Sequence, residues 1–342
     1  MKRLARRMAA SVFVVWSVVS LAFAIDVGLP GDPARMVAGP QARLADVARI
    51  RDQLGLDRPP IVQYARFWRR LVHFGPHFFD PSVATEHASC AVVVPLGAGA
   101  VHVDLGKSFQ FRQPVTNVIA GRWLRTLALA LAGLFLQLSF GVATGVAAAG
   151  RPGSWPSRLL LGASLFGISA PTFLIAIGLQ YAFAFRLRWL PIDGFGTTLT
   201  EHALCLVLPA TTLGIYGAAY YTRLVRDEMI GLLRQDWVRT ARAKGASPFR
   251  VLTRHALRNA LAPIVAAAGV DFGALMGGAV VTETVFRWPG IGELSVRAAL
   301  HRDGPVVLAC VIVTSMAVVM SSLAADLICA RLGRHEGEVG PR

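Results

Sequence analysis

The stretch DWVRTARAKGASPFRVLTRHALRNALAP, Asp236 to Pro263, decides how this chain is organised. It is strongly basic and lies between segments that are apolar over the length of a membrane span. Gly245 is suited to end a helix that we expect to begin at Asp227, whose charge favours the positive end of a helix dipole. Ser247 and Pro248 suit the start of a second helix. The sequence predicts a basic helical hairpin built to be bound by a soluble partner.

Composition places the chain in a bilayer. Hydrophobic residues make up 54% of its 342 residues and charged residues only 16%, which is low for a soluble globular protein. The formal net charge of +15 would suggest nucleic-acid binding in a soluble domain. Here Lys and Arg gather in short segments beside apolar spans, which indicates that they set the membrane topology.

Six segments are long and apolar enough to cross a membrane, for which a helix needs about 20 residues. The sequence therefore predicts an all-α integral membrane protein with six transmembrane helices. The first span is also compatible with a secretory signal peptide, because four basic residues precede it and Ala22-Phe23-Ala24 ends it. The six predicted spans are Met8–Ile25, Trp123–Ala149, Leu159–Phe185, Ala203–Leu224, Ile264–Val285 and Pro305–Ala330.

The distribution of Lys and Arg predicts the orientation of these spans. With the N-terminus in the cytoplasm, the four inside segments hold four, two, nine and three of these residues, and the two short outside loops hold two and three. Basic residues favour the cytoplasmic side, whereas long loops cross largely regardless of charge. We therefore expect both termini and the hairpin in the cytoplasm.

The spans divide the chain into four expected parts. These are a cytoplasmic tip with the first transmembrane helix at 1–28, an extracytoplasmic segment at 29–121, a core of five transmembrane helices at 122–330 that contains the hairpin at 225–262, and a cytoplasmic tail at 331–342.

The outer segment combines two amphipathic stretches with one that has no clear period. Apolar residues at helical spacing favour helices at Gln41–Leu54 and Ile61–Phe74, the second fit to lie along the membrane surface. From Gly75 to His102 the pattern gives way to Gly, Pro and His. Several side chains here are of types that bind soft metals, but their spacing fits no compact site, and we expect no metal there. These residues are His73, His77, His87, Cys90 and His102.

The sequence shows no catalytic or nucleotide-binding motif of its own. Gly106-Lys107-Ser108 resembles the end of a phosphate-binding loop, but that loop requires glycine at position 101, where this chain has Val101. The sequence also contains no nucleophile with a base at a spacing suited to catalysis and no carboxylate pair. We therefore expect a protein that is not an enzyme and binds no cofactor.

The hairpin resembles that of a known family, the membrane-spanning subunits of binding-protein-dependent ABC importers, specifically the peptide/nickel group (dipeptide/oligopeptide permease B-type). Thr240 to Gly245 reads T-A-R-A-K-G and His255 to Leu261 reads H-A-L-R-N-A-L, as in that group's form of the cytoplasmic EAA loop. The stretch near 75–102 departs from the family as an insertion. Further similar motifs are Pro30-Gly31-Asp32-Pro33, Asp104-Leu105-Gly106 with Ser108, Glu283-Thr284-Val285-Phe286 and Pro289-Gly290-Ile291-Gly292.

The resemblance implies a transport subunit in a bacterial inner membrane. Its implied partners are a second permease subunit, two ATP-binding subunits, an extracytoplasmic solute-binding protein and membrane lipid, but no nucleic acid. The ATP-binding subunits would use ATP, and the hairpin seated in their cleft would transmit their closure to the spans. The residues expected at this contact are Arg239, Ala241, Arg242, Lys244, Gly245, Ala246, Phe249 and Arg250.

Polar residues inside the spans are candidates for the translocation path. Asp271 is an ionisable residue in hydrocarbon, which is costly unless it finds a partner or water. It lies about 200° around its helix from Gly269, which belongs to a predicted close-packing stripe with Gly273 and Gly277. The alternative for each polar residue is a contact in helix packing. The residues expected to line the path are Asp271, Gln137, Thr211 and Tyr216.

The resemblance favours peptides as the solute and leaves nickel, glycosides and opines open. The competing class is a membrane protein that works alone, either a secondary transporter or an integral-membrane enzyme. A secondary transporter more often shows paired repeats and several charges at the membrane midplane. Asp271 is the one clear charge deep in a span of this sequence, so an importer driven by separate ATPases is favoured.

Overall fold

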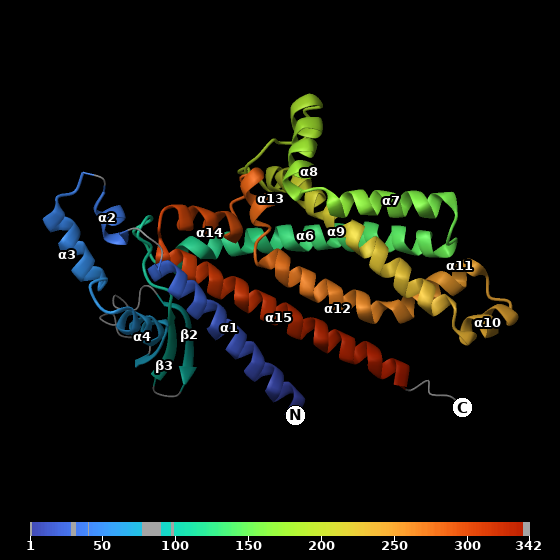
Figure 1. Ribbon diagram of the computed structural model, residues 1–342, viewed down its shortest axis with the longest axis horizontal. Helices are drawn as coiled ribbons and strands as arrows, with labels where there is room; N and C mark the ends of the chain where they lie inside the picture. The colour runs from blue at the N-terminus through green and yellow to red at the C-terminus, as the bar shows by residue number, and fades with distance from the viewer. Residues whose placement is uncertain (1, 29–31, 40, 77–89, 97–98, 338–342) are drawn as a thin grey trace. The chain divides into compact units, whose positions relative to one another are not determined.

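The computed structural model describes residues 2–28, 32–39, 41–76, 90–96 and 99–337. This described part is mostly helical and contains one small sheet (Figure 1). Its contacts divide it into two compact units. Unit 1 comprises Met1–Leu124 and Gly290–Met316, and unit 2 comprises Arg125–Pro289 and Ala317–Arg342.

Among the residues that the structure describes, five helices are long and apolar enough to cross a membrane, which confirms five of the predicted spans as apolar helices. Each helix is longer than the apolar segment that predicts it, because the hydrogen-bonded backbone continues beyond the hydrophobic part of the sequence. The helices are α1 (Lys2–Gly28), α6 (Val115–Gly150), α9 (Leu199–Leu233), the continuous stretch Pro248–Met276, and α15 (Gly304–Gly337).

The third predicted span is broken. α7 (Trp155–Ser169) ends at Ala170, whose ψ of 126° is extended, and α8 (Thr172–Leu179) begins after Pro171. α8 continues as the π-helix η1 (Gln180–Arg186). The two halves of the predicted span, Trp155–Ser169 and Thr172–Arg186, are bent by 102° relative to each other. A residue before proline avoids the helical conformation, so Pro171 interrupts the apolar run. Counted as one broken span, this pair is the sixth membrane segment.

The fifth span ends before the predicted Val285. α12 (Leu257–Met276) stops at a pair of glycines, and α13 (Val280–Val285) follows as a separate short helix. Gly278 has a φ of +111°, which glycine adopts readily and other residues do not, so the helix ends inside the apolar run. At its other end, α12 is continuous with α11 (Pro248–Arg250) and the π-helix η2 (Val251–Ala256). The second arm of the hairpin and the fifth span are therefore one helix.

The prediction of an all-α chain is wrong for the outer segment, which contains a three-stranded antiparallel sheet of order β1-β3-β2. β1 (Val72–Pro76) and β2 (Cys90–Leu96) both pair with β3 (Gly99–Asp104). Valines are frequent in these strands, and β-branched residues pack well on a pleated surface. Strand formation from Val72 also ends the second amphipathic helix before Phe74.

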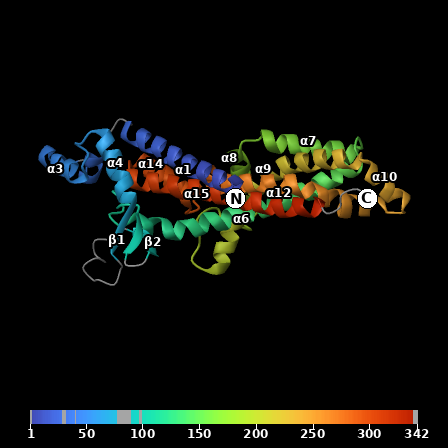
Figure 2. The same cartoon turned by 90° about the horizontal axis from the view of Figure 1, so that it is seen from below.

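Unit 1 packs the amphipathic helices of the outer segment on membrane helices. α2 (Pro33–Ala38), α3 (Leu44–Leu54) and α4 (Pro60–Leu71) belong to it, and α4 lies beside the sheet in both views (Figure 1, Figure 2). Phe67 and Leu71 of α4 pack with Val19 of α1 and with Leu308 and Ile312 at the start of α15. A second core in this unit joins the start of α6 to α14 (Ile291–Leu300) and α15.

Unit 2 contains a close crossing of α6 and α9 at two glycines. A methyl group built at Gly141 would lie 2.4 Å from Tyr221 Cβ, and one built at Gly145 would lie 2.7 Å from Val225 Cβ. These glycines are four residues apart, so they lie on one face of α6 and let the two backbones approach. This crossing brings the part of α9 that precedes the hairpin against the second half of α6.

A second close crossing joins α12 and the end of α15. A methyl group built at Gly269 would lie 2.1 Å from Ala325 Cβ, and one at Gly273 would lie 2.5 Å from Ser321 Oγ. The predicted close-packing stripe is confirmed for these two glycines. Gly277 does not contact another helix in this way, because it is the C-cap of α12.

Candidate functional site

The first arm of the hairpin is α10 (Asp236–Ala243), which is separated from α9 by Arg234 and Gln235. The expected helix start at Asp227 is wrong, because α9 continues through that position to Leu233. Val225 and Met229 on either side of Asp227 are fully buried and hold this part of α9 in the core. Packing of these apolar residues therefore extends α9 past Asp227 and Glu228, the acidic residues that resemble a helix start.

The turn between the arms is a Schellman motif. The Ala246 N–H donates to the Ala241 carbonyl at 3.1 Å, and the Gly245 N–H donates to the Arg242 carbonyl at 2.9 Å. Gly245 has a φ of +82°, a left-handed conformation that glycine adopts without strain. Ser247 Oγ accepts a hydrogen bond from the Arg250 N–H at 3.4 Å, with Pro248 in the first turn of α11. The predicted end near Gly245 and the cap at Ser247 are confirmed.

The outer face of the hairpin carries most of the residues expected to contact a partner. Phe249 is 74% exposed although its ring is apolar. A methyl group at Gly245 would meet no other atom within 4 Å, so the turn is open to an approaching surface. Ala241 and Ala246 are half-buried, and the exposed residues of the set are Arg239, Arg242, Lys244, Gly245, Phe249 and Arg250.

The inner face of the hairpin is anchored to the membrane helices. Val238 of α10 and Val251 of η2 are each 1% exposed. Trp237 and Leu252 pack on a buried cluster whose members come from α6, α9, η2 and α12. This cluster consists of Ala149, Val225, Met229, Ala256, Ala260 and Ile264. Because both arms share this core with three membrane helices, a force applied to the hairpin acts on those helices as well.

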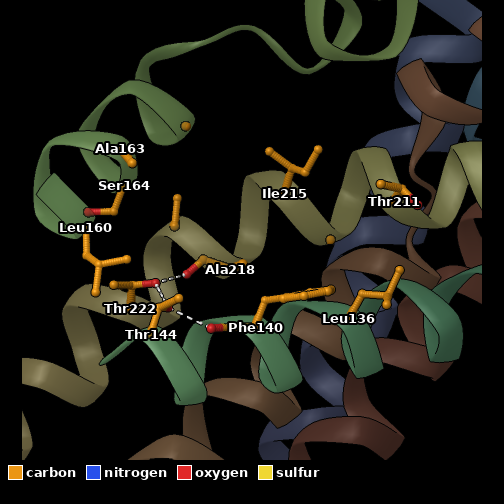
Figure 3. Close-up of a pocket in the computed structure, with 13 residues that line it drawn as sticks. Leu136, Phe140, Thr144, Leu160, Ala163, Ser164, Thr211, Ile215, Ala218 and Thr222 are labelled. Carbon is orange, nitrogen blue, oxygen red and sulfur yellow. Dashed lines mark hydrogen bonds between the residues drawn. The ribbon is translucent and has the colours of Figure 1, made fainter. Parts of the chain in front are cut away.

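A cavity of about 470 Å³ lies between α6, α7 and α9 (Figure 3). Most of its lining is apolar. Thr144 of α6 and Thr222 of α9 point toward each other, with their hydroxyl oxygens 2.7 Å apart. The Thr222 hydroxyl also lies 2.7 Å from the Ala218 carbonyl of its own helix, to which it donates. The remaining hydroxyl groups in the lining are those of Ser164 and Thr211.

The candidates for the translocation path occupy different environments. Thr211 is the one of the four that lines this cavity. Gln137 is 2% exposed, its Nε2 donates to the Leu213 carbonyl at 3.1 Å, and a methyl group at Gly217 would lie 2.2 Å from its Cδ. Gln137 thus contacts α9 closely. Tyr216 is 43% exposed on α9.

Asp271 is half-buried on α12 and accepts a hydrogen bond from the Tyr221 hydroxyl of α9 at 3.3 Å. Tyr221 is itself fully buried, and its Cβ faces Gly141 of α6. The structure therefore supplies a partner for this carboxyl group within the spans. Tyr221 and the Thr144–Thr222 pair do not stand out in the sequence, because nothing in an aromatic or hydroxyl residue of an apolar run tells which helix it faces.

The phosphate-loop-like turn at Gly106-Lys107-Ser108 is closed by a carboxylate of the chain itself. Asp303, which is fully buried, accepts hydrogen bonds from the Ser108 hydroxyl, from the Phe109 N–H at 3.1 Å and from the Gln110 N–H at 3.0 Å. Within the motif, the Gly106 N–H donates to Asp104 Oδ1 at 2.7 Å and the Ser108 N–H donates to the Gln113 carbonyl at 3.0 Å. These donors are therefore used within unit 1.

The metal-ligand types near the sheet form no cluster in the part of the chain that the structure describes. The His73 and His102 rings stack with centroids 5.3 Å apart. His77, His87 and the side chain of Cys90 lie outside the described residues.

Two family models match the chain. The one described as binding-protein-dependent transport system inner membrane component matches residues 141–335, which include the hairpin and most of the residues that line the α6–α7–α9 cavity. The one described as the N-terminal membrane component of such systems matches residues 1–130.

Curated relatives match over nearly the same length. The glutathione transport system permease protein GsiC of Salmonella paratyphi A is 38% identical over 304 residues, which cover 89% of this chain and 88% of that protein. GsiC of Escherichia coli K12 is 36% identical with the same coverage.

Solved structures match less closely in sequence. Two inward-facing crystal forms of the MetNI methionine ABC transporter match with TM-scores of 0.51 and 0.52 at 18% identity, covering 64% of this chain and 98% of that chain. This likeness shows the fold alone.

Proposed function

The chain belongs to the binding-protein-dependent transport system inner membrane components and is an ABC importer permease, and we propose that it forms the path for glutathione or another short peptide. The proposed identity of the solute is based on relatives that are named for glutathione transport. ATP-dependent uptake of labelled glutathione and of short peptides by the reconstituted complex tests it. Transport of a different solute with no uptake of either would end the proposal.

We propose that the chain assembles with a second permease subunit and with two ATP-binding subunits that use ATP, and that an extracytoplasmic solute-binding protein delivers the solute. Both termini and the hairpin face the cytoplasm of a bacterial inner membrane, and residues 29–121 face the binding protein. The uneven distribution of Lys and Arg supports this orientation. The test uses the permease without its ATP-binding subunits, with its four native cysteines replaced by serine and a cysteine introduced at exposed Phe249. An impermeant thiol reagent should label this cysteine in inverted vesicles and not in intact cells.

The hairpin couples this permease to the ATP-binding subunits. One observation carries the proposal: the open Gly245 turn and the exposed Phe249 lie on a hairpin whose second arm continues as a single helix, Pro248–Met276, through the membrane. A push on Phe249 therefore acts along the fifth span, and the shared buried cluster passes it to α6 and α9. Such a mechanical link is suited to a change between two conformations in which the path is open alternately to the two sides of the membrane.

Replacing Phe249 by alanine tests this contact. We expect Phe249→Ala to lower co-purification of the ATP-binding subunits and ATP-driven uptake by roughly tenfold or more, because an exposed aromatic anchor is removed from an interface. Phe166→Ala is the matched control, since Phe166 is 78% exposed but lies on α7. Equal behaviour of the two variants would remove Phe249 from the coupling surface. Full transport by this chain alone, without ATP, would reject the importer mechanism altogether.

For the translocation path we propose Asp271, Thr211, Tyr216 and Gln137. The hydrogen bond from Tyr221 supports Asp271, because it keeps a carboxyl group within the spans at a defined position. Asp271→Asn should keep this bond and lower uptake by roughly tenfold, since the amide is not an anion. Tyr221→Phe is the control that removes the bond and leaves the carboxyl group. Unchanged uptake of every tested solute in Asp271→Asn and Asp271→Ala would exclude Asp271 from the path.

A further inference from the structure

A second cavity, of about 650 Å³, lies in unit 1 between the end of α1, the start of α15, and helices α3 and α4. Its lining is strongly basic on one side: four arginines face two aspartates, so the ionised lining has two positive charges in excess. These residues are Arg51, Arg58, Arg66, Arg70, Asp26 and Asp32. We propose that this cavity binds a phosphate group, such as the headgroup of an anionic phospholipid.

Pairing within the cavity leaves the positive charge on one wall. Arg51 Nη2 lies 2.5 Å from Asp32 Oδ2, and this hydrogen bond raises the pKa of Arg51 above its usual value. Arg58, Arg66 and Arg70 have no such carboxylate partner within the described residues. The unmatched charge therefore belongs chiefly to the wall formed by α4 and the loop before it.

The two arginines of α4 lie against turns that contain glycine. Arg66 and Arg70 are four residues apart and lie on the same face of the helix. Methyl groups built at Gly55 and Gly106 would lie 3.1 Å from Arg66 Nη1 and 3.0 Å from Arg70 Nη2. Both glycines have a positive φ, of +69° and +80°, and they let the flanking turns approach the guanidinium groups.

A third polar side chain of α4 fastens the loop beside this wall. Gln63 Nε2 donates to the Leu56 carbonyl at 3.2 Å and to the Arg58 carbonyl at 2.8 Å. The loop that carries Gly55 and Arg58 is therefore tied to α4. Because the backbone of this loop is already ordered, less of its conformational freedom is lost when an anion binds beside it.

The chemistry of the cavity fits a phosphate attached to an apolar body. Guanidinium groups bind phosphate oxygens through paired, charge-assisted hydrogen bonds. The lining also includes apolar side chains from three helices, namely Phe23 of α1, Phe67 of α4 and Leu308 of α15. The cavity lies where α1 ends and α15 begins, and both are candidate membrane spans, so it is at the level of lipid phosphates. A free phosphate ion offers the same charged group without the apolar part.

The test uses the full-length permease, purified in detergent with its co-purifying subunits. Native mass spectrometry measures binding of added phosphatidylglycerol, and thermal unfolding in increasing inorganic phosphate measures binding of the free ion. The cavity variant is R66Q/R70Q. The control is R49Q/R69Q, which removes the same charge from exposed positions of α3 and α4 that do not line the cavity.

We expect phosphatidylglycerol binding to weaken by roughly tenfold or more in the cavity variant and by less than about twofold in the control. The same contrast with inorganic phosphate alone would assign the cavity to a free phosphate. An equal loss in both variants would show that general surface charge attracts the lipid, and no loss in either would show that the cavity binds no phosphate. Either of the last two results overturns the proposal.

Discussion

Glycine serves opposite purposes at the helix crossings and at the hairpin of unit 2. At the crossings, Gly141, Gly145, Gly269 and Gly273 stand where a methyl group would lie between 2.1 and 2.7 Å from an atom of another helix. At the hairpin, a methyl group built at Gly245 would meet nothing within 4 Å, but the residue has a φ of +82°. The crossings need the absence of a side chain, whereas the turn needs a backbone conformation. Substitutions that separate space from conformation should therefore act differently on the two regions.

The largest effect on stability is expected at the α12–α15 crossing. Gly269→Ala should lower the free energy of unfolding by about 3 kcal/mol, because the new methyl group meets Ala325 Cβ, which can move only with its backbone. Gly162→Ala is the control: Gly162 lies inside α7 with open space around it, and alanine is the better helix former. Thermal unfolding in detergent compares them. Equal melting temperatures would mean that α12 and α15 do not cross closely here.

An intermediate effect is expected at the hairpin turn. Gly245→Val should destabilise the turn by about 1–2 kcal/mol, because a β-branched residue strongly disfavours the left-handed conformation. ATP-driven uptake should fall with it. Gly245→Asn should retain most uptake, since asparagine tolerates this conformation. Measured uptake in the two variants separates the causes. If asparagine is as harmful as valine, the partner requires an empty surface at this position, and normal uptake in both would refute its role in coupling.

The smallest effect is expected inside the α6–α9 crossing, where hydroxyl groups accompany the glycines. A double-mutant cycle with Thr144→Val and Thr222→Val should give a coupling free energy of about 0.6 kcal/mol, as for other hydrogen bonds between membrane helices. The bond is weak because each hydroxyl has a single proton, and each also lies within hydrogen-bond distance of a carbonyl of its own helix, that of Phe140 for Thr144 and that of Ala218 for Thr222. Thermal unfolding of the four proteins measures it. Additive losses would show that the crossing depends on close packing alone.

Local sequence features predicted the hairpin well and the limits of the helices less well. Ser247, Pro248 and Gly245 act through the backbone of their own neighbours, so their roles follow from the order of residues. The start of the first arm was wrong, because burial of Val225 and Met229 extends α9 past Asp227. Pro171 shows the converse. The apolar composition of the third span predicts one continuous helix, but the residue before a proline avoids the helical conformation, and the helix is broken at this position.

By itself, the sequence determined that this is a membrane protein with apolar helices and a basic hairpin, since hydropathy and capping depend on composition and on near neighbours. The resemblance of two short runs in the hairpin also led to the family. Only the tertiary structure decided that Tyr221 meets Asp271, that Gly141 and Gly145 admit α9, and that Arg66 and Arg70 share a cavity. Those contacts join residues far apart in the chain, and which faces of two helices meet depends on packing across the whole unit.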